Sequence, residues 1–304
     1  MQIIVPGATG FIGGHVCAEL LRAGHEVIAL TRRPESARAR LDPRIRIHGW
    51  DARAPEPLLE LIAAADGVVN LAGEPIAGQR WTAAHKERIQ RSRVEATAAV
   101  VAALRAVPPR PRVLANPSGV GYYRGRGDEE ITEASPAGDD FFADVCREWE
   151  AAARAAEDVA RVVILRIGVV LGREGGALKA MLPPFRLGLG GPLGSGQQWF
   201  PWVHVADVAG LFRFALEQAE AKGPINAVAP ESVRMIDFCR ALARVLHRPC
   251  WFRVPQPALR LVLGEMADAV LASARVRPAA AVRLGYSFRF PRLEEALRDL
   301  LGSG

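Results

Sequence analysis

The feature that most constrains this chain is a glycine-rich turn that follows its first apolar run. Residues 2–5 are apolar, and Gly7-x-x-Gly10-x-x-Gly13 comes directly after them. Glycines at this spacing allow a tight turn, a close approach of backbone to a pyrophosphate, and close packing of the next helix. Because that helix would offer unpaired N–H groups and a positive dipole end, we predict a dinucleotide-binding βα unit rather than an ordinary strand-to-helix turn.

The first 170 residues alternate short apolar runs with longer amphipathic ones, which indicates βαβ units. Runs that are apolar throughout are typical of a parallel sheet buried on both faces. We therefore predict a doubly wound α/β fold, a Rossmann fold, whose nucleotide-binding domain spans residues 1–175. Strands are expected at 2–5, 26–30, 44–48, 67–71, 112–115 and 162–166, and helices at 11–22, 58–64, 83–105 and 139–157.

The second part of the chain differs from the first in its content of Gly and Pro. Gly and Pro are dense at 182–196, which predicts long ordered loops. We expect a smaller C-terminal α/β lobe at 176–304 that binds substrate, with parts of 204–230 returning to the first domain. Its expected elements are helices at 204–220, 235–246, 259–273 and 293–301 and a strand at 225–228.

Charge and composition exclude several classes of protein. Lys+Arg is 39 against 33 Asp+Glu, a net charge of +6, yet the arginines are scattered and interleaved with acids. This distribution favours a solvated surface over a nucleic-acid interface. The longest uncharged stretch late in the chain is rich in Gly and Pro, so no membrane association is expected. The partner we expect is a small-molecule substrate, and the oligomeric state stays open.

Cysteine and histidine usage argues against a metal site. The four cysteines form no CxxC pair, and the six histidines form no HExxH. We expect a reducing compartment, hence a cytoplasmic protein.

The end of the second strand indicates which dinucleotide binds. NAD-binding chains usually place an acid there for the ribose hydroxyls. This strand instead ends in Thr31, Arg32 and Arg33. Guanidinium groups suit a 2′-phosphate, so we predict NADP(H), with surface arginines as the alternative interpretation.

Several further segments resemble a known family. Together with the glycine turn, NLAG at 70–73, SRVEAT at 92–97 and LRIGVVLG at 165–172 resemble the extended short-chain dehydrogenase/reductases. More narrowly, PPFRLGLGGPLGSG at 183–196 and WVHVAD at 202–207 are similar to the atypical subgroup called epimerase family proteins, of the 39U type. The resemblance covers essentially the whole chain.

The resemblance implies a Rossmann body that binds NADP(H) and a C-terminal domain peculiar to the subgroup. At matching positions it implies that Thr9, Phe11 and Ile12 line the pyrophosphate, and that Thr31 and Arg32 hold the adenosine phosphate. Asp51 would touch adenine and Arg93 would reach the cofactor, with a turn residue and a surface cation as alternatives. The other residues predicted at the cofactor are Leu71, Ala72 and Gly73 under the nicotinamide ribose, and Arg33, Ser118, Arg166, Gly168 and Val169.

The catalytic pattern of this family is incomplete here. In active extended members, a Ser or Thr after the fifth strand polarises the substrate oxygen, and a Tyr-x-x-x-Lys pair supplies the proton. Ser118 matches the serine, but Phe142 and Cys146 stand at the Tyr and Lys positions. Phenylalanine has no proton to give, and a thiol does not replace an ammonium.

Three hypotheses follow for the proton. Tyr122 or Tyr123 beside Ser118 replaces the missing acid, with Asp144, Cys146 and His204 as further candidates. Alternatively, hydride transfer occurs with water or substrate supplying the proton. In the third hypothesis, the protein binds NADP(H) without turnover, as a sensor or partner-binding module. The two tyrosines could equally be packed aromatics, and His204 could cap a helix.

A substrate wall is expected in the second lobe. An apolar, aromatic surface with few polar groups is typical of small-molecule sites. The alternative is that these side chains form the core of the lobe. The residues predicted to form the wall are Met181, Phe185, Trp199, Trp202 and His204. The sequence thus favours an NADP(H)-dependent oxidoreductase or epimerase-like enzyme acting on a small carbonyl or hydroxyl compound.

Overall fold

The centre of the protein is a seven-stranded sheet in which every strand pair is parallel. The computed structural model describes residues 1–76, 81–110 and 112–302. In order across the sheet, the strands are β11 (Gly223–Ala227), β7 (Arg161–Ile167), β5 (Val113–Gly119), β4 (Gly67–Val69), β1 (Gln2–Pro6), β2 (Glu26–Thr31) and β3 (Arg46–Gly49).

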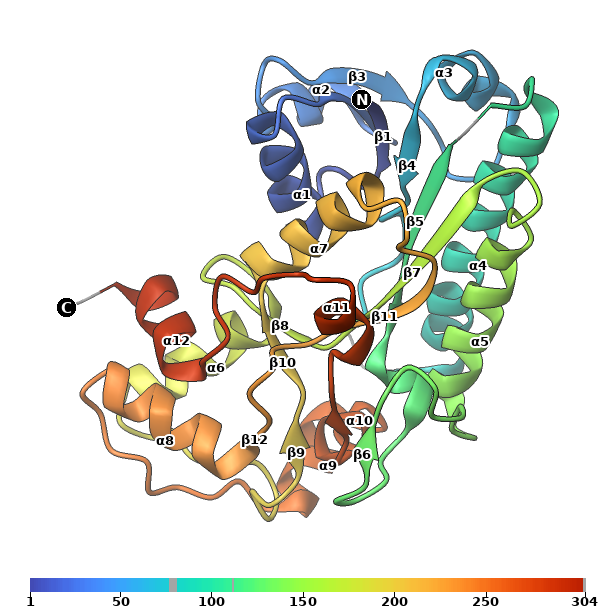
Figure 1. The fold of residues 1–304 in the computed structure, drawn as a ribbon. Helices are drawn as coiled ribbons and strands as arrows, with labels where there is room; N and C mark the ends of the chain where they lie inside the picture. Colours follow the sequence, from blue (N-terminus) through green and yellow to red (C-terminus); the bar gives the residue numbers. More distant parts are fainter. Residues whose placement is uncertain (77–80, 111, 303–304) are drawn as a thin grey trace.

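Helices cover both faces of this sheet, because successive side chains of a strand point to opposite faces. Ile3 and Val5 of β1 pack in one core cluster with α1 (Phe11–Arg22) and α7 (Val205–Glu217), whereas Ile4 packs in the other. That second cluster holds side chains of α3 (Leu59–Ala64), α4 (Ala83–Ala106) and α5 (Phe141–Arg154). Figure 1 shows α1 and α7 on one side of the sheet and α4 and α5 on the other. The predicted doubly wound fold is confirmed.

Short elements connect these layers. α2 (Pro34–Arg38) lies between β2 and β3, and the 3₁₀ turn η1 (Glu56–Leu58) precedes α3. A second 3₁₀ turn, η2 (Val120–Tyr123), follows β5 directly, and β6 (Glu130–Ile131) comes next along the chain. The chain therefore turns sharply at the carboxyl end of β5, where Ser118 lies.

The second lobe has its own core beside the sheet. Besides α7 and β11, which belong to the layers above, the elements that follow β7 are β8 (Val169–Leu171), α6 (Gly176–Arg186), β9 (Trp199–Phe200), β10 (Trp202–His204), β12 (Val233–Arg234), α8 (Met235–Val245), α9 (Gln256–Leu263), α10 (Met266–Leu271), β13 (Arg275–Val276), α11 (Ala279–Arg283) and α12 (Leu293–Leu301). Side chains of α6, α8 and α12 form one apolar cluster with Phe200 and Trp202. β13 pairs with β6, so the late chain returns to the turn after β5.

The expected loop at 182–196 is wrong for its first part. Helix α6 continues to Arg186 with Pro183 and Pro184 inside it. Each proline removes a helical hydrogen bond. Leu182 and Phe185 nevertheless point into the lobe core, and their burial offsets that loss. Burial of the neighbouring side chains therefore outweighs the tendency of proline to end a helix at this position.

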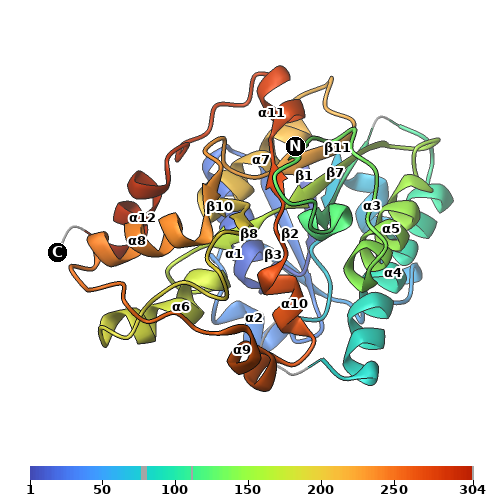
Figure 2. The ribbon, with the colours of Figure 1, turned by 90° about the horizontal axis from the view of Figure 1, so that it is seen from below.

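The single helix expected at 259–273 is two helices, α9 and α10. Gly264 between them has a φ of +61°, a left-handed conformation that favours glycine and ends α9. Lys86 Nζ, near the start of α4, lies 2.6 Å from the Glu265 carboxylate, just before α10. Figure 2 shows α10 between the second-lobe helices and α4. In the part of the chain that the structure describes, no helix is long and apolar enough to cross a membrane.

Candidate functional site

The glycine turn leads from β1 into the exposed end of a helix. Gly7 has a φ of +79°, and a Cβ there would lie 2.4 Å from the Leu71 carbonyl oxygen. A Cβ on Gly13 would lie 2.3 Å from the Gly7 carbonyl oxygen, so glycine is needed for α1 to sit this close to β1. Helix α1 starts after Gly10 with no side-chain cap and no acid in its first turn. Its N–H groups and positive dipole end are therefore available to an anion.

The three side chains next to these glycines have different surroundings. The Phe11 ring fills the space over Gly172 and Gly175, which ties the start of α1 to the segment between β8 and α6. Thr9 and Ile12 are half-buried. The Thr9 carbonyl oxygen accepts a hydrogen bond of 3.3 Å from Arg40 Nη2. Sequence reasoning missed Arg40, because it lies beyond the strand end where the motif places a phosphate-binding group.

The end of β2 carries two exposed guanidinium groups. Arg32 and Arg33 are exposed, and neither is within ion-pair distance of a carboxylate among the residues that the structure describes. The Arg33 backbone N–H donates to Thr31 Oγ1 at 3.2 Å, which shapes the strand end. No described carboxylate therefore neutralises the two guanidinium charges, which lie beside the carboxyl edge of the sheet.

Asp51 serves as a turn residue in this structure. Its carboxylate accepts hydrogen bonds from the backbone N–H groups of Arg53 at 2.9 Å and Ala54 at 3.2 Å. These bonds, the one from Ala54 first, lower the pKa of Asp51. The role of a turn residue was the alternative left open by the sequence, and a contact with adenine stays a prediction.

The segment after β4 packs directly on the glycine turn. The Leu71 backbone N–H donates to the Pro6 carbonyl at 2.9 Å, and Ala72 and Gly73 follow. Under Gly73 lies Arg93 of α4: a Cβ on that glycine would be 3.3 Å from Arg93 Cγ. Arg93 Nη1 donates to the carbonyls of Ile89 at 2.9 Å and Glu74 at 3.0 Å. Arg93 is only 7% exposed, so it is not the surface cation that was the alternative interpretation.

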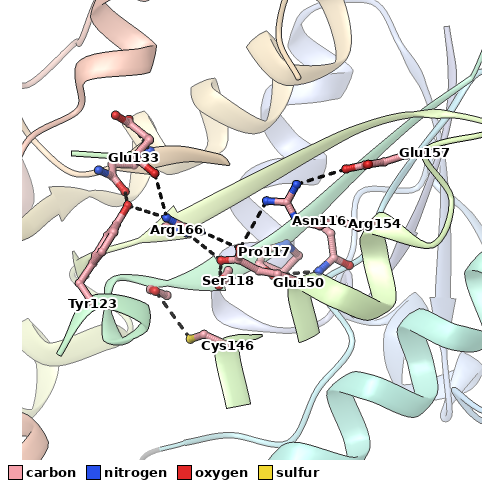
Figure 3. A network of polar contacts seen from close by, with 12 residues as sticks. Asn116, Pro117, Ser118, Tyr123, Glu133, Cys146, Glu150, Arg154, Glu157 and Arg166 are labelled. Atoms are coloured by element: carbon pink, nitrogen blue, oxygen red, sulfur yellow. Dashed lines mark hydrogen bonds and ion pairs between the residues drawn. The ribbon is translucent and has the colours of Figure 1, made fainter. Parts of the chain in front are cut away.

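A buried polar network surrounds Ser118 at the carboxyl end of β5 (Figure 3). Ser118 Oγ donates to Glu150 Oε1 at 2.8 Å. Arg166 donates from Nε to Glu150 Oε1 and from Nη2 to Glu150 Oε2, both at 2.8 Å. The side chains of Arg166 and Glu150 are 3% and 4% exposed, so this bidentate ion pair lies inside the protein. The hydroxyl of Ser118 is thereby oriented by a carboxylate that is itself held by a guanidinium.

Tyr123 extends this network, whereas Tyr122 only packs on it. The Tyr123 hydroxyl accepts from Arg166 Nη1 at 2.8 Å and donates to Asn226 Oδ1 at 2.7 Å. Burial raises the pKa of Tyr123 to about 12. Arg166 Cζ lies 3.5 Å from the centroid of the Tyr122 ring. The structure therefore brings Ser118, Tyr123 and Arg166 together, with the tyrosine hydroxyl enclosed.

The two positions that the sequence predicts for the Tyr–Lys pair, Phe142 and Cys146, have no hydroxyl or ammonium group. Phe142 packs on Gly121 and on Trp81, with a ring separation of 4.6 Å. The Cys146 thiol donates to the Gly119 carbonyl at 3.7 Å. Burial raises the pKa of this thiol, against the opposing effects of Ser118 and Gly119. Asp144 lies on the exposed side of α5 in an ion pair with Arg147.

The predicted residues after β7 face the second lobe. A Cβ on Gly168 would lie 2.2 Å from the Pro201 carbonyl oxygen, and the Val169 N–H donates to that carbonyl at 2.7 Å. Both residues hold the two lobes together in this structure. Their contact with a cofactor stays a prediction.

The predicted substrate wall divides into core and partly exposed residues. Phe185 and Trp202 are enclosed in the second-lobe cluster at 2% and 0% exposure, which corrects their place in an open wall. His204 caps α7 through its Nδ1, which accepts from the Ala206 N–H at 3.0 Å, and burial lowers its pKa to about 4. Which large apolar side chains are enclosed depends on tertiary packing, and residue type alone does not reveal it. Met181 and Trp199 are only partly buried and stay candidates.

Glu150 is the residue that sequence reasoning missed at this site. Its partners are far along the chain: Ser118 is 32 residues away and Arg166 is 16 residues away. The sequence contains a signal for Glu150, because a carboxylate on the buried side of α5 requires a charged or hydrogen-bonding partner.

No group of three or more His, Cys, Asp and Glu side chains in the described residues is placed to hold a metal ion.

The chain is similar in sequence to known proteins over almost its whole length. Residues 3–228 match the model of the NAD dependent epimerase/dehydratase family, and residues 254–300 match a domain of unknown function. A chloroplastic homologue of epimerase family protein SDR39U1 from Arabidopsis thaliana is 41% identical over 99% of this chain and 87% of its own length. Epimerase family protein YfhF of Bacillus subtilis is 38% identical over 99% of this chain and 98% of its own.

A solved structure agrees with this result. The crystal structure of human epimerase family protein SDR39U1 (isoform 2) with NADPH matches with a TM-score of 0.88 at 38% identity, covering 99% of both chains. The resemblance expected from the motifs is confirmed.

Proposed function

We propose a function from the premise that this chain belongs to the NAD dependent epimerase/dehydratase family and, within it, to the epimerase family proteins. The function is that of an NADP(H)-dependent oxidoreductase or epimerase-like enzyme acting on a small carbonyl or hydroxyl compound. When bound, the cofactor would supply or accept a hydride at its nicotinamide ring. Residues 1–175, with parts of 204–230, would bind it, and residues 176–304 would supply the substrate lobe.

The observation that carries the proposal is the glycine turn with its open helix end. Backbone N–H groups at the start of α1, after Gly10, would hold the pyrophosphate, since α1 has no side-chain cap or acid that would compete. Exposed Arg32 and Arg33 would hold the 2′-phosphate, and Arg40 would add charge beside Thr9. The relative crystallised with NADPH supports this choice of cofactor.

Ser118 would orient the reacting oxygen of the substrate. Its hydroxyl is held by Glu150, whose carboxylate is in turn held by Arg166. Ser118 would have to release this bond in order to donate to a substrate.

Free thiols at all four cysteines suit the reducing, cytoplasmic location that we also propose.

A second candidate function is an NADP(H)-binding sensor without turnover. Three features favour it: Phe142 and Cys146 stand at the positions predicted for the proton relay, the Ser118 hydroxyl already donates to Glu150, and the Tyr123 hydroxyl is enclosed. In that case cofactor binding would be tight, and no carbonyl compound would be reduced.

One titration tests the cofactor assignment. We expect Arg32→Ala to weaken NADPH binding at least about tenfold and NADH binding hardly at all, because a charge-assisted contact to the 2′-phosphate is lost. Arg38→Ala is the matched control, since Arg38 is exposed on α2 and paired with Glu35 at 3.8 Å. Protein fluorescence or calorimetry measures both affinities. Equal losses for the two coenzymes would refute the phosphate assignment.

A turnover assay then separates the two candidate functions. Substrate-dependent NADPH oxidation that falls sharply in Ser118→Ala supports the enzyme. Tight NADPH binding with no oxidation across a panel of aldehydes, ketones and oxo acids supports the sensor.

A further inference from the structure

A cavity lies along α1, on the side that faces the chain between α2 and β3. Its volume is about 320 Å³, which is at the lower end of the range for small-molecule sites. Residues at helical spacing on one face of α1 form the first wall: Gly14, Cys17, Ala18, Leu21 and Arg22. The second wall comes from the segment 40–45. The first wall begins beyond the third glycine of the turn, so the cavity lies beside α1 and not at its N-terminus.

The two walls run in the same direction, which makes the cavity a groove. Arg40 Nη2 donates to the Thr9 carbonyl at 3.3 Å, so the second wall starts beside the start of α1. At its other end, Ile45 leads into β3, whose first residue pairs with Ile28 near the start of β2. From Gly14 to the end of α1 the helix rises about 12 Å, which sets the length of the groove.

The floor of the groove is apolar and is left open. Cys17 and Ile45 are buried members of the core cluster beneath it, and Leu21 and Leu41 pack against that cluster while half-buried. A Cβ on Gly14 would meet no atom within 4 Å, so the groove is also open at the end near the glycine turn. A ligand with an apolar body would cover this surface and remove it from water.

The rim of the groove is cationic. It carries three guanidinium groups, those of Arg22, Arg40 and Arg44, and the carboxylate of Asp42. Arg44 holds that carboxylate through Nε and Nη2, at 2.9 and 2.8 Å, and Arg22 is paired with Glu19. Arg40 has no carboxylate within 4.0 Å among the described residues, and its described hydrogen bond goes to a backbone carbonyl. Its exposed guanidinium is therefore the charge that the groove leaves for an anion.

We propose that this groove binds a small anion with a slender apolar chain, in chemical class a medium-chain carboxylate. The carboxylate would accept hydrogen bonds from Arg40, because a guanidinium pairs well with a carboxylate. The chain would lie over Cys17, Ala18 and Leu21 and would gain from burial of its methylene groups. A groove about 12 Å long between two walls suits an extended chain better than a bulky ring system.

Binding in the groove is measured by calorimetry on the full chain with sodium hexanoate and sodium octanoate. Hexanamide, and sodium chloride at equal ionic strength, are the references. We expect saturable binding at one site, with octanoate up to about fifteenfold tighter than hexanoate because two more methylene groups are covered. Hexanamide should bind at least about tenfold more weakly than hexanoate, since it lacks the charge. Absence of saturable carboxylate binding, or equal affinities for hexanoate and hexanamide, would overturn the proposal.

A variant that fills the groove locates the ligand. Gly14→Leu places a side chain where a Cβ meets no atom, so the fold should be kept, and octanoate affinity should fall at least about tenfold. Ala151→Leu is the matched control, because it adds the same side chain at an exposed position of α5. The melting temperature of each variant reports whether it folds. An unchanged affinity in folded Gly14→Leu would place the ligand elsewhere and overturn the proposal.

A second variant assigns the anion to Arg40. Arg40→Met should weaken octanoate at least about tenfold, as expected for the loss of a charge-assisted contact. Arg38→Met is its control, since Arg38 is exposed nearby in the chain and paired with Glu35 at 3.8 Å. Arg40 lies on the exposed rim, so this variant decides even where Gly14→Leu does not fold. Equal affinities in Arg40→Met and Arg38→Met would refute the role of Arg40.

Arg40 also links the groove to the cofactor, and this part of the inference rests on the proposed function. An anion at Arg40 takes up charge that would otherwise act on the cofactor phosphates, so each ligand should weaken the other by the same factor. With increasing NADPH, the apparent dissociation constant of octanoate should rise to a plateau. A rise without limit would mean one shared site and would overturn the separate groove, whereas no rise would overturn the link alone. If NADPH does not bind at all, the proposed function fails, and the carboxylate titration still tests the groove.

Discussion

Arg166 of β7 and Arg93 of α4 are both buried, yet the two charges are satisfied in different ways. Arg166 is enclosed with a carboxylate from α5 on its Nε–Nη2 edge and a tyrosine hydroxyl on Nη1. Arg93 is also enclosed, but carbonyl oxygens satisfy only Nη1. The first arginine is paired within the folded framework, whereas the Nε–Nη2 edge of the second has no partner among the described residues. Burial of a charged group thus indicates structure or function according to whether its partner is already present.

The largest effect should come from removing the partner of Arg166. We expect Glu150→Gln to lower the free energy of unfolding by about 3–5 kcal/mol, because it leaves a buried guanidinium without its counter-charge. Urea unfolding followed by circular dichroism measures the change. A loss below about 1 kcal/mol would mean that the pair is not the structural element described here.

Two variants control for this result. Glu157→Gln removes an exposed carboxylate near the end of the same helix, 3.3 Å from Arg154, and should cost less than about 1 kcal/mol. The double variant Glu150→Leu with Arg166→Met should recover most of the loss, since no charge is then left unpaired. A double variant as unstable as Glu150→Gln would contradict the electrostatic explanation.

A smaller effect is expected at Tyr123. Tyr123→Phe leaves Asn226 Oδ1 without its donor, and it leaves Arg166 Nη1 with only the 3.4 Å hydrogen bond to the Glu133 carbonyl oxygen. We therefore expect a loss of about 1–3 kcal/mol. Tyr122→Phe keeps the ring that stacks on Arg166 and should change stability by less than about 0.5 kcal/mol. Thermal and urea unfolding compare the two variants. Equal effects would show that the hydroxyl of Tyr123 is not part of the network.

The smallest effect should come from Arg93. In the ligand-free protein, Arg93→Met loses two hydrogen bonds to carbonyls but also removes an unpaired buried charge, so we expect a change below about 1 kcal/mol. The same urea unfolding experiment measures it. A loss as large as that of Glu150→Gln would remove the distinction between the two arginines.

The cofactor half of the site could be predicted because its signals are local. The turn at Gly7, Gly10 and Gly13 and the strand end at Arg32 each lie within one βα unit, so spacing alone locates them. Asp51 could have been assigned to a turn by the same kind of rule, because its bonds reach only Arg53 and Ala54. The comparison of the whole chain with its relatives then confirmed the family that the motifs resemble.

The second lobe was harder to predict because packing decided it. Pro183 and Pro184 predicted a loop, yet the burial of Leu182 and Phe185 keeps α6 helical to Arg186. Phe185 and Trp202 were expected to face a substrate, and they fill the core instead. Apolar side chains are equally suited to both tasks, so their identity alone does not separate them.

The sequence by itself determined the doubly wound sheet and the glycine turn, since each depends on residue type and on spacing along one or two elements. Only the tertiary structure decided which buried charges are paired. Glu150 reaches Arg166 from a different element, and no carboxylate among the described residues reaches the free edge of Arg93. The physical reason is that the cost of a buried charge depends on the few groups within about 4 Å of it, and folding brings those groups from distant parts of the chain.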